Sequence, residues 1–176
     1  MSNPWESFPT IWKSKSAYFT WLRGLLRRGW NKSPVKIEFL KKHRYKIKNP
    51  SKGKKEIWGG RCNICKNEFP MKNLQVDHVI EAGSLKDFSD IEGFVTRLLA
   101  CGEEDLQLAC KGCHSIITHS QRHKLSFEDA IKDKARIEFF KQKAPEIKEK
   151  LQALGALEED LRNAKTREEF YRKRCM

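Results

Sequence analysis

The residues with the clearest capacity for chemistry are cysteines and histidines between positions 62 and 119. Two Cys-x-x-Cys pairs, Cys62/Cys65 and Cys110/Cys113, are separated by 44 residues. A pair of thiolates spaced by two residues can bind one metal ion from a tight turn, and two such pairs complete a tetrahedral zinc site. The sequence therefore predicts one structural Zn²⁺, bound by these four cysteines.

Three further ionisable residues lie in the same stretch and are not needed by the zinc. Asp77 and His78 are adjacent, and His114 directly follows Cys113. A neutral imidazole can take a proton from water near neutral pH. A cation held by one carboxylate and one imidazole keeps coordination positions open for a phosphate oxygen and water. Residue types and spacing therefore leave two interpretations open: a catalytic site, or a structural zinc ribbon with incidental histidines.

The order of these residues resembles the zinc-ribbon branch of the HNH endonuclease family. The resemblance is carried by the segments VDHV, at 76–79, and DLQLACKGCH, at 105–114. It implies a ββα-metal fold, in which a β-hairpin carries Asp-His and a helix begins near the second cysteine pair. It also implies that His78 is the general base and that Asp77 and His114 bind one catalytic divalent cation. Mixed N/O ligands suit Mg²⁺, Mn²⁺, Ni²⁺ or Zn²⁺ alike.

Two positions depart from the usual form of that family. Asp105 stands where the family commonly has Asn, in the loop that orients the base, and we expect Asp105 to support His78 in catalysis. Some relatives, such as colicin nuclease domains, have a further metal-binding His where this chain has Thr118. His119, the next residue, is therefore a candidate third ligand of the catalytic cation.

The net charge of +13 is unevenly distributed. Residues 1–60 contain 15 Lys and Arg against 3 acidic residues, whereas 61–125 contain 8 against 9, and 126–176 contain 13 against 11. A basic excess confined to one segment indicates a polyanionic partner, here double-stranded DNA, with a solvated basic arm as the alternative. The expected DNA contacts come from two N-terminal helices, the linker after them and the helix after the second cysteine pair: Arg23, Arg27, Arg28, Lys36, Lys41, Lys42, Arg44, Lys46, Lys48 and Arg122.

Apolar periodicity predicts the elements that hold these residues. We expect helices over 14–29 and 33–44, a flexible basic linker over 45–55 that includes Lys52, and a hairpin with its turn at 70–73. A further helix should start at a capping box of Ser89 and Glu92, and charged helices should follow Ser126. The expected class is α+β, mostly α. A basic helical arm with its linker (1–56) precedes a small ββα-metal core with the four-cysteine zinc ribbon (57–125), and charged C-terminal helices (126–176) follow it.

Together these features predict a metal-dependent HNH endonuclease that nicks double-stranded DNA as a monomer, because one ββα unit has one site. The alternatives are a non-catalytic zinc-ribbon DNA-binding module, an RNA nuclease, and an assembly factor that binds a partner protein through its C-terminal helices. Small proteins resembling this one are frequent in bacteriophage genomes, with homing and DNA-packaging roles. No signal peptide and no apolar run of about 20 residues is evident, so we expect a reducing cytoplasmic setting and no membrane partner.

Overall fold

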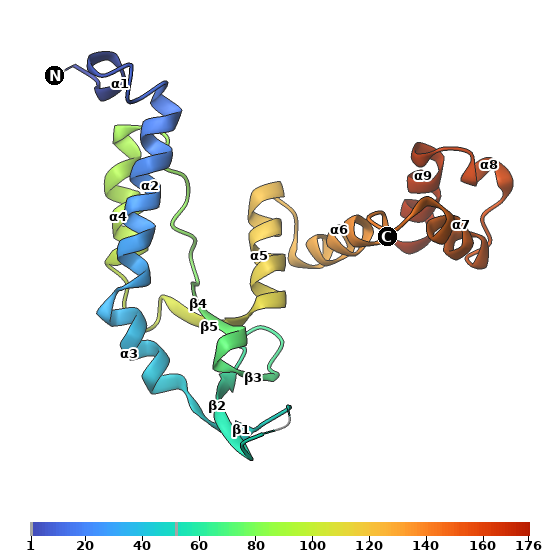
Figure 1. Cartoon of the computed structure of the whole chain (residues 1–176), viewed down its shortest axis with the longest axis horizontal. Helices are drawn as coiled ribbons and strands as arrows, with labels where there is room; N and C mark the ends of the chain where they lie inside the picture. Colours follow the sequence, from blue (N-terminus) through green and yellow to red (C-terminus); the bar gives the residue numbers. More distant parts are fainter. Residues whose placement is uncertain (1, 52) are drawn as a thin grey trace. The chain divides into compact units, whose positions relative to one another are not determined.

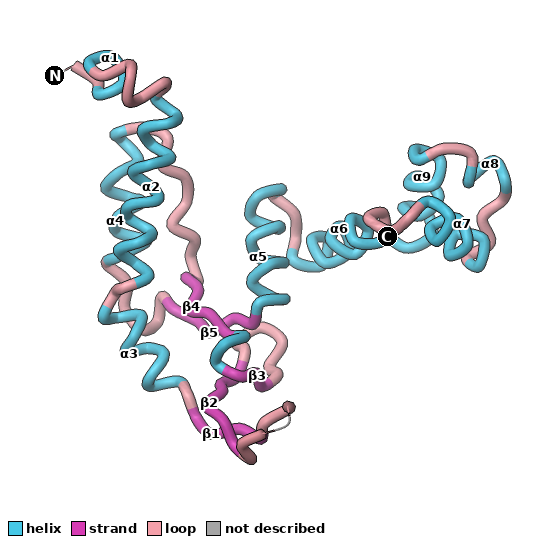
Figure 2. The backbone as a smooth tube through the Cα atoms, in the orientation of Figure 1, coloured by secondary structure: helices cyan, strands magenta, loops and turns pink. Residues whose placement is uncertain are grey.

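The computed structural model describes residues 2–51 and 53–176, so Lys52 of the expected linker lies outside the described residues. About 56% of the chain is helical, and the strands of the described residues form two small antiparallel sheets. Figures 1 and 2 show how these helices and strands follow one another along the chain. The α+β class expected from the sequence is therefore confirmed. The chain forms two compact units, Met1–Cys113 and His114–Met176.

The helices of the first unit form its main apolar core. The Ser14 hydroxyl accepts a hydrogen bond from the backbone N–H of Ala17 (3.1 Å), which satisfies a free donor at the start of the second helix. Helices α2 (Lys15–Asn31) and α4 (Ile91–Leu99) lie side by side in Figure 1. Both contribute buried residues to the same apolar cluster. The helical elements of this unit are α1 (Pro4–Ser7), α2 (Lys15–Asn31), α3 (Pro34–His43), η1 (Met71–Asn73), η2 (Phe88–Asp90) and α4 (Ile91–Leu99). The largest fully buried side chains of this core are Phe19, Phe94, Leu98 and Leu108.

Two sheets complete the first unit. The three-stranded sheet has the order β1-β2-β3, and the two-stranded sheet pairs β4 with β5. All neighbouring strands are antiparallel. The strands are β1 (Tyr45–Lys48), β2 (Glu56–Arg61), β3 (Glu68–Pro70), β4 (Leu74–His78) and β5 (Leu106–Cys110).

The segment expected to be a flexible basic linker is partly a strand, so that prediction is wrong. β1 pairs with β2 over four residues, from Tyr45 opposite Gly59 to Lys48 opposite Glu56. The side chain of Ile47 is only 7% exposed, and a Cβ built on Gly59 would lie 2.3 Å from it. Because glycine has no side chain, position 59 leaves room for the buried side chain of Ile47. Tyr45 and Ile47 alternate with lysines, as expected for a strand, but the high lysine content of the segment favoured a linker in the sequence analysis.

The pairing of the Asp77-His78 strand also differs from the expected local hairpin. β3 pairs with β2, and the strand that pairs with β4 is β5, after an insertion of 27 residues that contains α4. Leu74 and Val76 of β4 are buried in the same apolar cluster as Leu106 and Leu108 of its partner β5. The expected capping box at Ser89 and Glu92 is likewise displaced. The capping box is formed two residues earlier, by Asp87 and Asp90, and the Asp90 carboxylate accepts from the N–H of Asp87 (3.0 Å).

The second unit is helical and has a separate apolar cluster. Ser126 caps its second helix, because its hydroxyl accepts from the N–H of Asp129 (3.0 Å), as the sequence predicted. Gly155, at φ +92°, follows the end of the third. The helices are α5 (Lys111–His123, whose first turn belongs to the first unit), α6 (Phe127–Phe139), α7 (Ala144–Ala153), α8 (Glu158–Leu161) and α9 (Ala164–Cys175). The buried centre consists of Ile147, Leu151 and Leu161, with Phe139, Phe140, Phe170 and Tyr171 against it.

Candidate metal centre and histidine site

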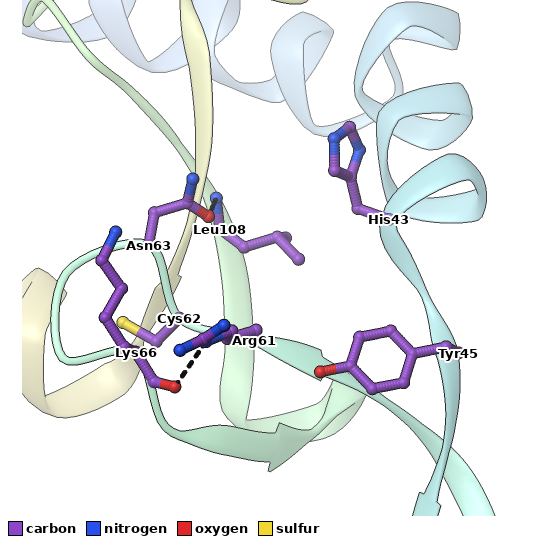
Figure 3. Close-up of a pocket in the computed structure, with 7 residues that line it drawn as sticks. All are labelled: His43, Tyr45, Arg61, Cys62, Asn63, Lys66 and Leu108. Atoms are coloured by element: carbon purple, nitrogen blue, oxygen red, sulfur yellow. Dashed lines mark hydrogen bonds between the residues drawn. The ribbon is translucent and has the colours of Figure 1, made fainter.

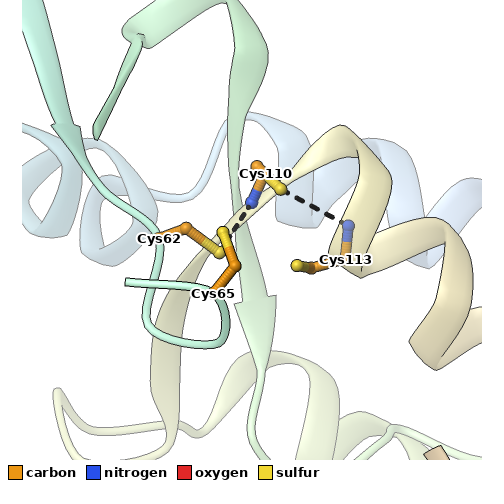
Figure 4. Close-up of side chains that lie close together, drawn as sticks. All are labelled: Cys62, Cys65, Cys110 and Cys113. Carbon is orange, nitrogen blue, oxygen red and sulfur yellow. Dashed lines mark hydrogen bonds between the residues drawn. The ribbon is translucent and has the colours of Figure 1, made fainter. Parts of the chain in front are cut away.

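The four cysteines of the two Cys-x-x-Cys pairs converge, as Figure 4 shows. The Sγ atoms of Cys62, Cys65, Cys110 and Cys113 all lie within 4.8 Å of one another. Four sulfurs at about 2.3 Å from one Zn²⁺ would be separated by about 3.8 Å in a tetrahedron, so a small adjustment of rotamers suffices. All four are free thiols, and three are buried. This cluster could hold a metal ion such as zinc.

Backbone contacts of the first cysteine turn tie the cluster to β5. The N–H of Asn63 donates to the Leu108 carbonyl (2.8 Å), and the Asn63 side-chain oxygen accepts from the Leu108 N–H (3.2 Å). Lys66 adopts a positive φ of 61°, which closes the turn and lets its N–H donate to the Cys62 carbonyl (3.0 Å). The cysteine turn is therefore fixed against the strand that leads into Cys110.

The electrostatics of the cluster suit a divalent cation. Burial by itself raises the pKa of Cys62. Hydrogen bonds from the backbone N–H groups of Cys110, Cys65 and Ile64 outweigh this effect and lower the pKa to about 6. Burial and the neighbouring thiols raise the pKa of Cys113 instead. Several adjacent thiolates repel one another unless a cation balances their charge, and Zn²⁺ supplies that charge. The donor set therefore fits zinc.

His78, at the end of β4, is held by residues from two helices. Its Nε2 lies 3.1 Å from the carbonyl oxygen of Leu98. A carbonyl can only accept, so Nε2 carries the proton and the lone pair of the neutral ring is on Nδ1. Leu98 is in the last turn of α4, where carbonyls lack intrahelical donors and form the negative end of the helix dipole. The ring of Trp30, from α2, packs against the imidazole with 4.4 Å between centroids.

Asp77 directly precedes His78 in β4, and Asp105 directly precedes Leu106, the residue of β5 that pairs with His78. Asp77, which is half-buried, stands opposite Gln107 in the β4–β5 register and points to the face of the strand opposite that of His78. Asp105 contacts backbone groups: its carboxylate accepts from the N–H of Gly102 (2.8 Å), and its carbonyl accepts from the N–H of Val79 (2.8 Å). Asp105 therefore fixes the chain immediately after His78.

His114 and His119 lie on α5, in the second unit. Both line a hollow of about 380 Å³, together with Ser115, Thr118, Arg122 and Lys134. His119 is anchored, because its Nε2 lies 2.8 Å from the carboxylate of Asp133, which also accepts from Arg136 (2.7 Å). These contacts, that of His119 first, hold the pKa of Asp133 below its usual value. An imidazole oriented by a carboxylate through one nitrogen keeps the other for a ligand.

The structure gathers only part of the predicted metal chemistry into a cluster. Among the described residues, the four cysteines are the one group of three or more His, Cys, Asp or Glu side chains close enough to share an ion. The second, catalytic cation therefore remains a prediction. It rests on Asp77 and His114, with His119 as a candidate third ligand.

The predicted DNA-binding residues are on the surface, with one exception. Lys36 is half-buried: its ammonium donates to Asn31 (3.1 Å) and lies 5.6 Å from the ring of Trp30, and burial lowers its pKa. Lys42 forms an ion pair with Glu103. The other members of the set are exposed: Arg23, Arg27, Arg28, Lys41, Arg44, Lys46, Lys48 and Arg122.

Sequence reasoning missed a hollow of about 470 Å³ beside the cysteine turn, shown in Figure 3. Arg61 and Lys66 line it, but they belong to a segment whose charges nearly cancel, so the regional sum concealed them. The other lining residues are His43, Tyr45, Cys62, Asn63 and Leu108. Trp30 and Leu98, which hold His78, were also missed. They lie 48 and 20 residues from it in sequence, and a backbone carbonyl leaves no sequence signal.

No protein-family model, curated protein or solved structure matches this chain. Within the described ranges, no helix has the length and apolar character needed to cross a membrane.

Proposed function

We propose that this chain is a metal-dependent endonuclease of the HNH type that hydrolyses phosphodiester bonds in double-stranded DNA. The observation that carries the proposal is the contact between His78 Nε2 and the Leu98 carbonyl (3.1 Å). It leaves the proton-accepting nitrogen, Nδ1, on a histidine that directly follows an oxygen donor, Asp77. The order of elements also supports the proposal, since β4 pairs with β5 and α5 begins directly after β5.

The proposed role of the four cysteines is to bind one structural Zn²⁺. The ion joins the cysteine turn after β2 to the end of β5 and the start of α5. Asn63 adds two hydrogen bonds to Leu108 in the middle of β5. Because β5 is the partner of β4 along its whole length, the ion also fixes the strand that carries Asp77 and His78.

Each of the proposed catalytic residues has a separate role. His78 Nδ1 accepts a proton from the attacking water as the water oxygen bonds to phosphorus. The Leu98 carbonyl, at the negative end of α4, stabilises the imidazolium that forms. The bond between phosphorus and the 3′-oxygen breaks, and the 3′-oxyanion takes a proton from solvent. Asp77 and His114 would hold the divalent cation, which when bound stabilises the charge on the phosphate and the departing oxygen.

Asp105 and His119 have supporting roles in this proposal. Asp105 is a positioning residue, because its contacts with Gly102 and Val79 shape the backbone next to His78. His119, oriented by Asp133, is the candidate third ligand of the cation.

The exposed basic residues of α2, α3 and β1 support duplex DNA as the partner. Arg and Lys side chains on a positively charged surface neutralise DNA phosphates. They position the protein on the duplex without recognising its base sequence. One hydrolytic site attacks one strand, so the expected product of a monomer is a nick. Two events, or a dimer, would be needed for a double-strand break.

The test is conversion of supercoiled plasmid to the open circle in the presence of Mg²⁺, Mn²⁺, Ni²⁺ or Zn²⁺. His78→Ala should abolish nicking and leave DNA affinity unchanged. His43→Ala is a matched control, since His43 also bonds a helix carbonyl, that of Phe39 (2.9 Å), and stacks on an aromatic ring. Equal activity of the His78→Ala variant and the wild type would refute the assignment of the base.

One observation favours a second candidate, a zinc-ribbon DNA-binding module without catalysis. The contacts of His78 with Trp30 and Leu98 also hold β4 against α2 and α4. This structural role by itself could account for a histidine at position 78. Under that function, wild-type protein would bind duplex DNA and nick it with none of the four ions. His78→Ala would then lower the melting temperature as its main effect.

A further inference from the structure

The β1–β2 hairpin, located in Figure 1, has an exposed indole, that of Trp58, in contact with cationic side chains. Trp58 is 46% exposed. Lys46 stands directly opposite it in the register, with its Nζ 4.3 Å from the centroid of the indole ring. The guanidinium carbon of Arg44 lies 4.5 Å from the same centroid. Lys48 shares this side of β1, opposite Glu56, so three cations accompany one carboxylate.

A hollow of about 410 Å³ adjoins the indole. Trp58 forms part of its lining, with Ile57, Pro70 and Met71 as apolar neighbours and Lys72 as a further cation. Hollows of this size suit ligands of a few rings. An apolar space beside an exposed aromatic ring, with cations next to both, suits a planar ring that is attached to an anionic chain.

We infer that the side of the hairpin formed by Arg44, Lys46, Lys48 and Trp58, called the Trp58 face below, binds an unpaired stretch of DNA. One base stacks on the indole, and the cations contact the phosphates on either side of it. A duplex cannot make this contact, because its base faces are covered by neighbouring bases. The inference deepens the proposed function, on which it rests for the choice of DNA, by naming a single-stranded part of the substrate.

The present contacts of the indole do not prevent stacking. A cation–aromatic contact at an exposed site is weaker than stacking between a base and an aromatic side chain. A base can therefore displace the Lys46 ammonium from the ring, and the ammonium then reaches a phosphate. Arg44, Lys46 and Lys48 are alternate residues, which places them about 6.7 Å apart along the strand direction. An extended sugar–phosphate chain can follow such a row.

The test measures binding of a fluorescent oligothymidine of about 12 nucleotides, and of a duplex of the same length, without added divalent cation. Trp58→Ala should lower the affinity for oligothymidine about ten-fold and that for the duplex by about two-fold or less. Trp58→Phe should retain most of the affinity, because phenylalanine also stacks. Trp21→Ala is the matched control: the indole of Trp21, on α2, is 44% exposed and packs against the rings of Trp12 and Tyr18. It should bind as the wild type does.

Tryptophan fluorescence gives a readout that does not depend on a destabilising variant. Oligothymidine should quench the emission of the wild type, and Trp58→Phe should lose that quenching while Trp21→Phe retains it. The inference is overturned if Trp58→Ala binds oligothymidine normally, or loses single-stranded and duplex affinity equally. A preference of about ten-fold or more for oligouridine would overturn the assignment to DNA. Since no cleavage is measured, this result and the nicking result can fail separately.

Discussion

Removal of the metal from the cysteine cluster should unfold the first unit and leave the second folded. The cluster connects the turn after β2 with β5 and α5, and its four sulfurs come from positions up to 51 residues apart. Structural Zn²⁺ contributes about 10–16 kcal/mol of apparent binding free energy at neutral pH. The whole free energy of unfolding of a domain is about 5–15 kcal/mol. The first unit cannot compensate for a loss of that size.

The two units can be followed separately. All five tryptophans lie in the first unit, at positions 5, 12, 21, 30 and 58, and Trp30 is only 6% exposed. Their emission therefore reports on that unit alone. The second unit has its own apolar centre around Leu151 and has no cysteine of the cluster. A zinc chelator should shift the tryptophan emission to the red, while far-ultraviolet circular dichroism retains the helical signal of the second unit.

Substitutions make the same prediction without a chelator. Cys110→Ser should lower the zinc content and lower the melting temperature reported by tryptophan emission. Cys101→Ser is the control, because Cys101 is partly buried in the same unit but lies outside the cluster. The reasoning is refuted if protein stripped of metal shows the same tryptophan emission and the same melting temperature as protein with one zinc bound.

Three further predictions follow from single interactions. Asp133→Asn, which weakens the contacts with His119 and Arg136, should destabilise the second unit by about 1–3 kcal/mol, measured by thermal melting at pH 7. Because the folded state lowers the pKa of Asp133, its contribution is present above about pH 4 and is lost as the pH falls through the lowered value, so the two melting temperatures should converge in acid. Asp105→Ala should slow nicking and lower the free energy of unfolding by about 1 kcal/mol. Asp105→Asn can still accept from the N–H of Gly102 and should retain nicking. An equal loss of nicking in both variants would contradict a positioning role. The affinity for duplex DNA should fall with salt by about 0.9 logarithmic units per phosphate contact, and a flat dependence would count against the basic helices as the anchor.

The parts of the fold that the sequence predicted are those set by local chemistry. The spacing of the four cysteines was sufficient to predict their convergence. The helices expected from position 14, from position 33 and after Ser126 are also present, with Ser14, Ser33 and Ser126 as their N-cap residues. A cap acts within a few residues, and each Cys-x-x-Cys pair is a local turn that needs the other pair to complete a tetrahedral site. The long-range pairings were not predictable in this way. β4 joins β5 across an inserted helix, and β1 joins β2, because apolar residues such as Val76 and Ile47 find buried partners that no local pattern specifies.

The candidate site shows the same division. Asp77, His78 and His114 were singled out by residue type, spacing and a family resemblance, and their catalytic role stays a prediction. The contacts that orient His78 were not predicted. A backbone carbonyl accepts a hydrogen bond whatever the residue, so Leu98 could not be singled out. Trp30 carries no mark in the sequence that separates it from the other tryptophans. Both depend on how α2 and α4 pack against β4.

The measurement that tests the account most directly is a plasmid-nicking assay on zinc-loaded protein, with and without an added divalent cation. The account predicts that the wild type converts supercoiled DNA to the open circle only when the cation is present. It predicts that His78→Ala and Asp77→Ala bind the plasmid with wild-type affinity and do not nick it. Nicking by His78→Ala at the wild-type rate, or no nicking by the wild type with any of the four ions, would contradict it.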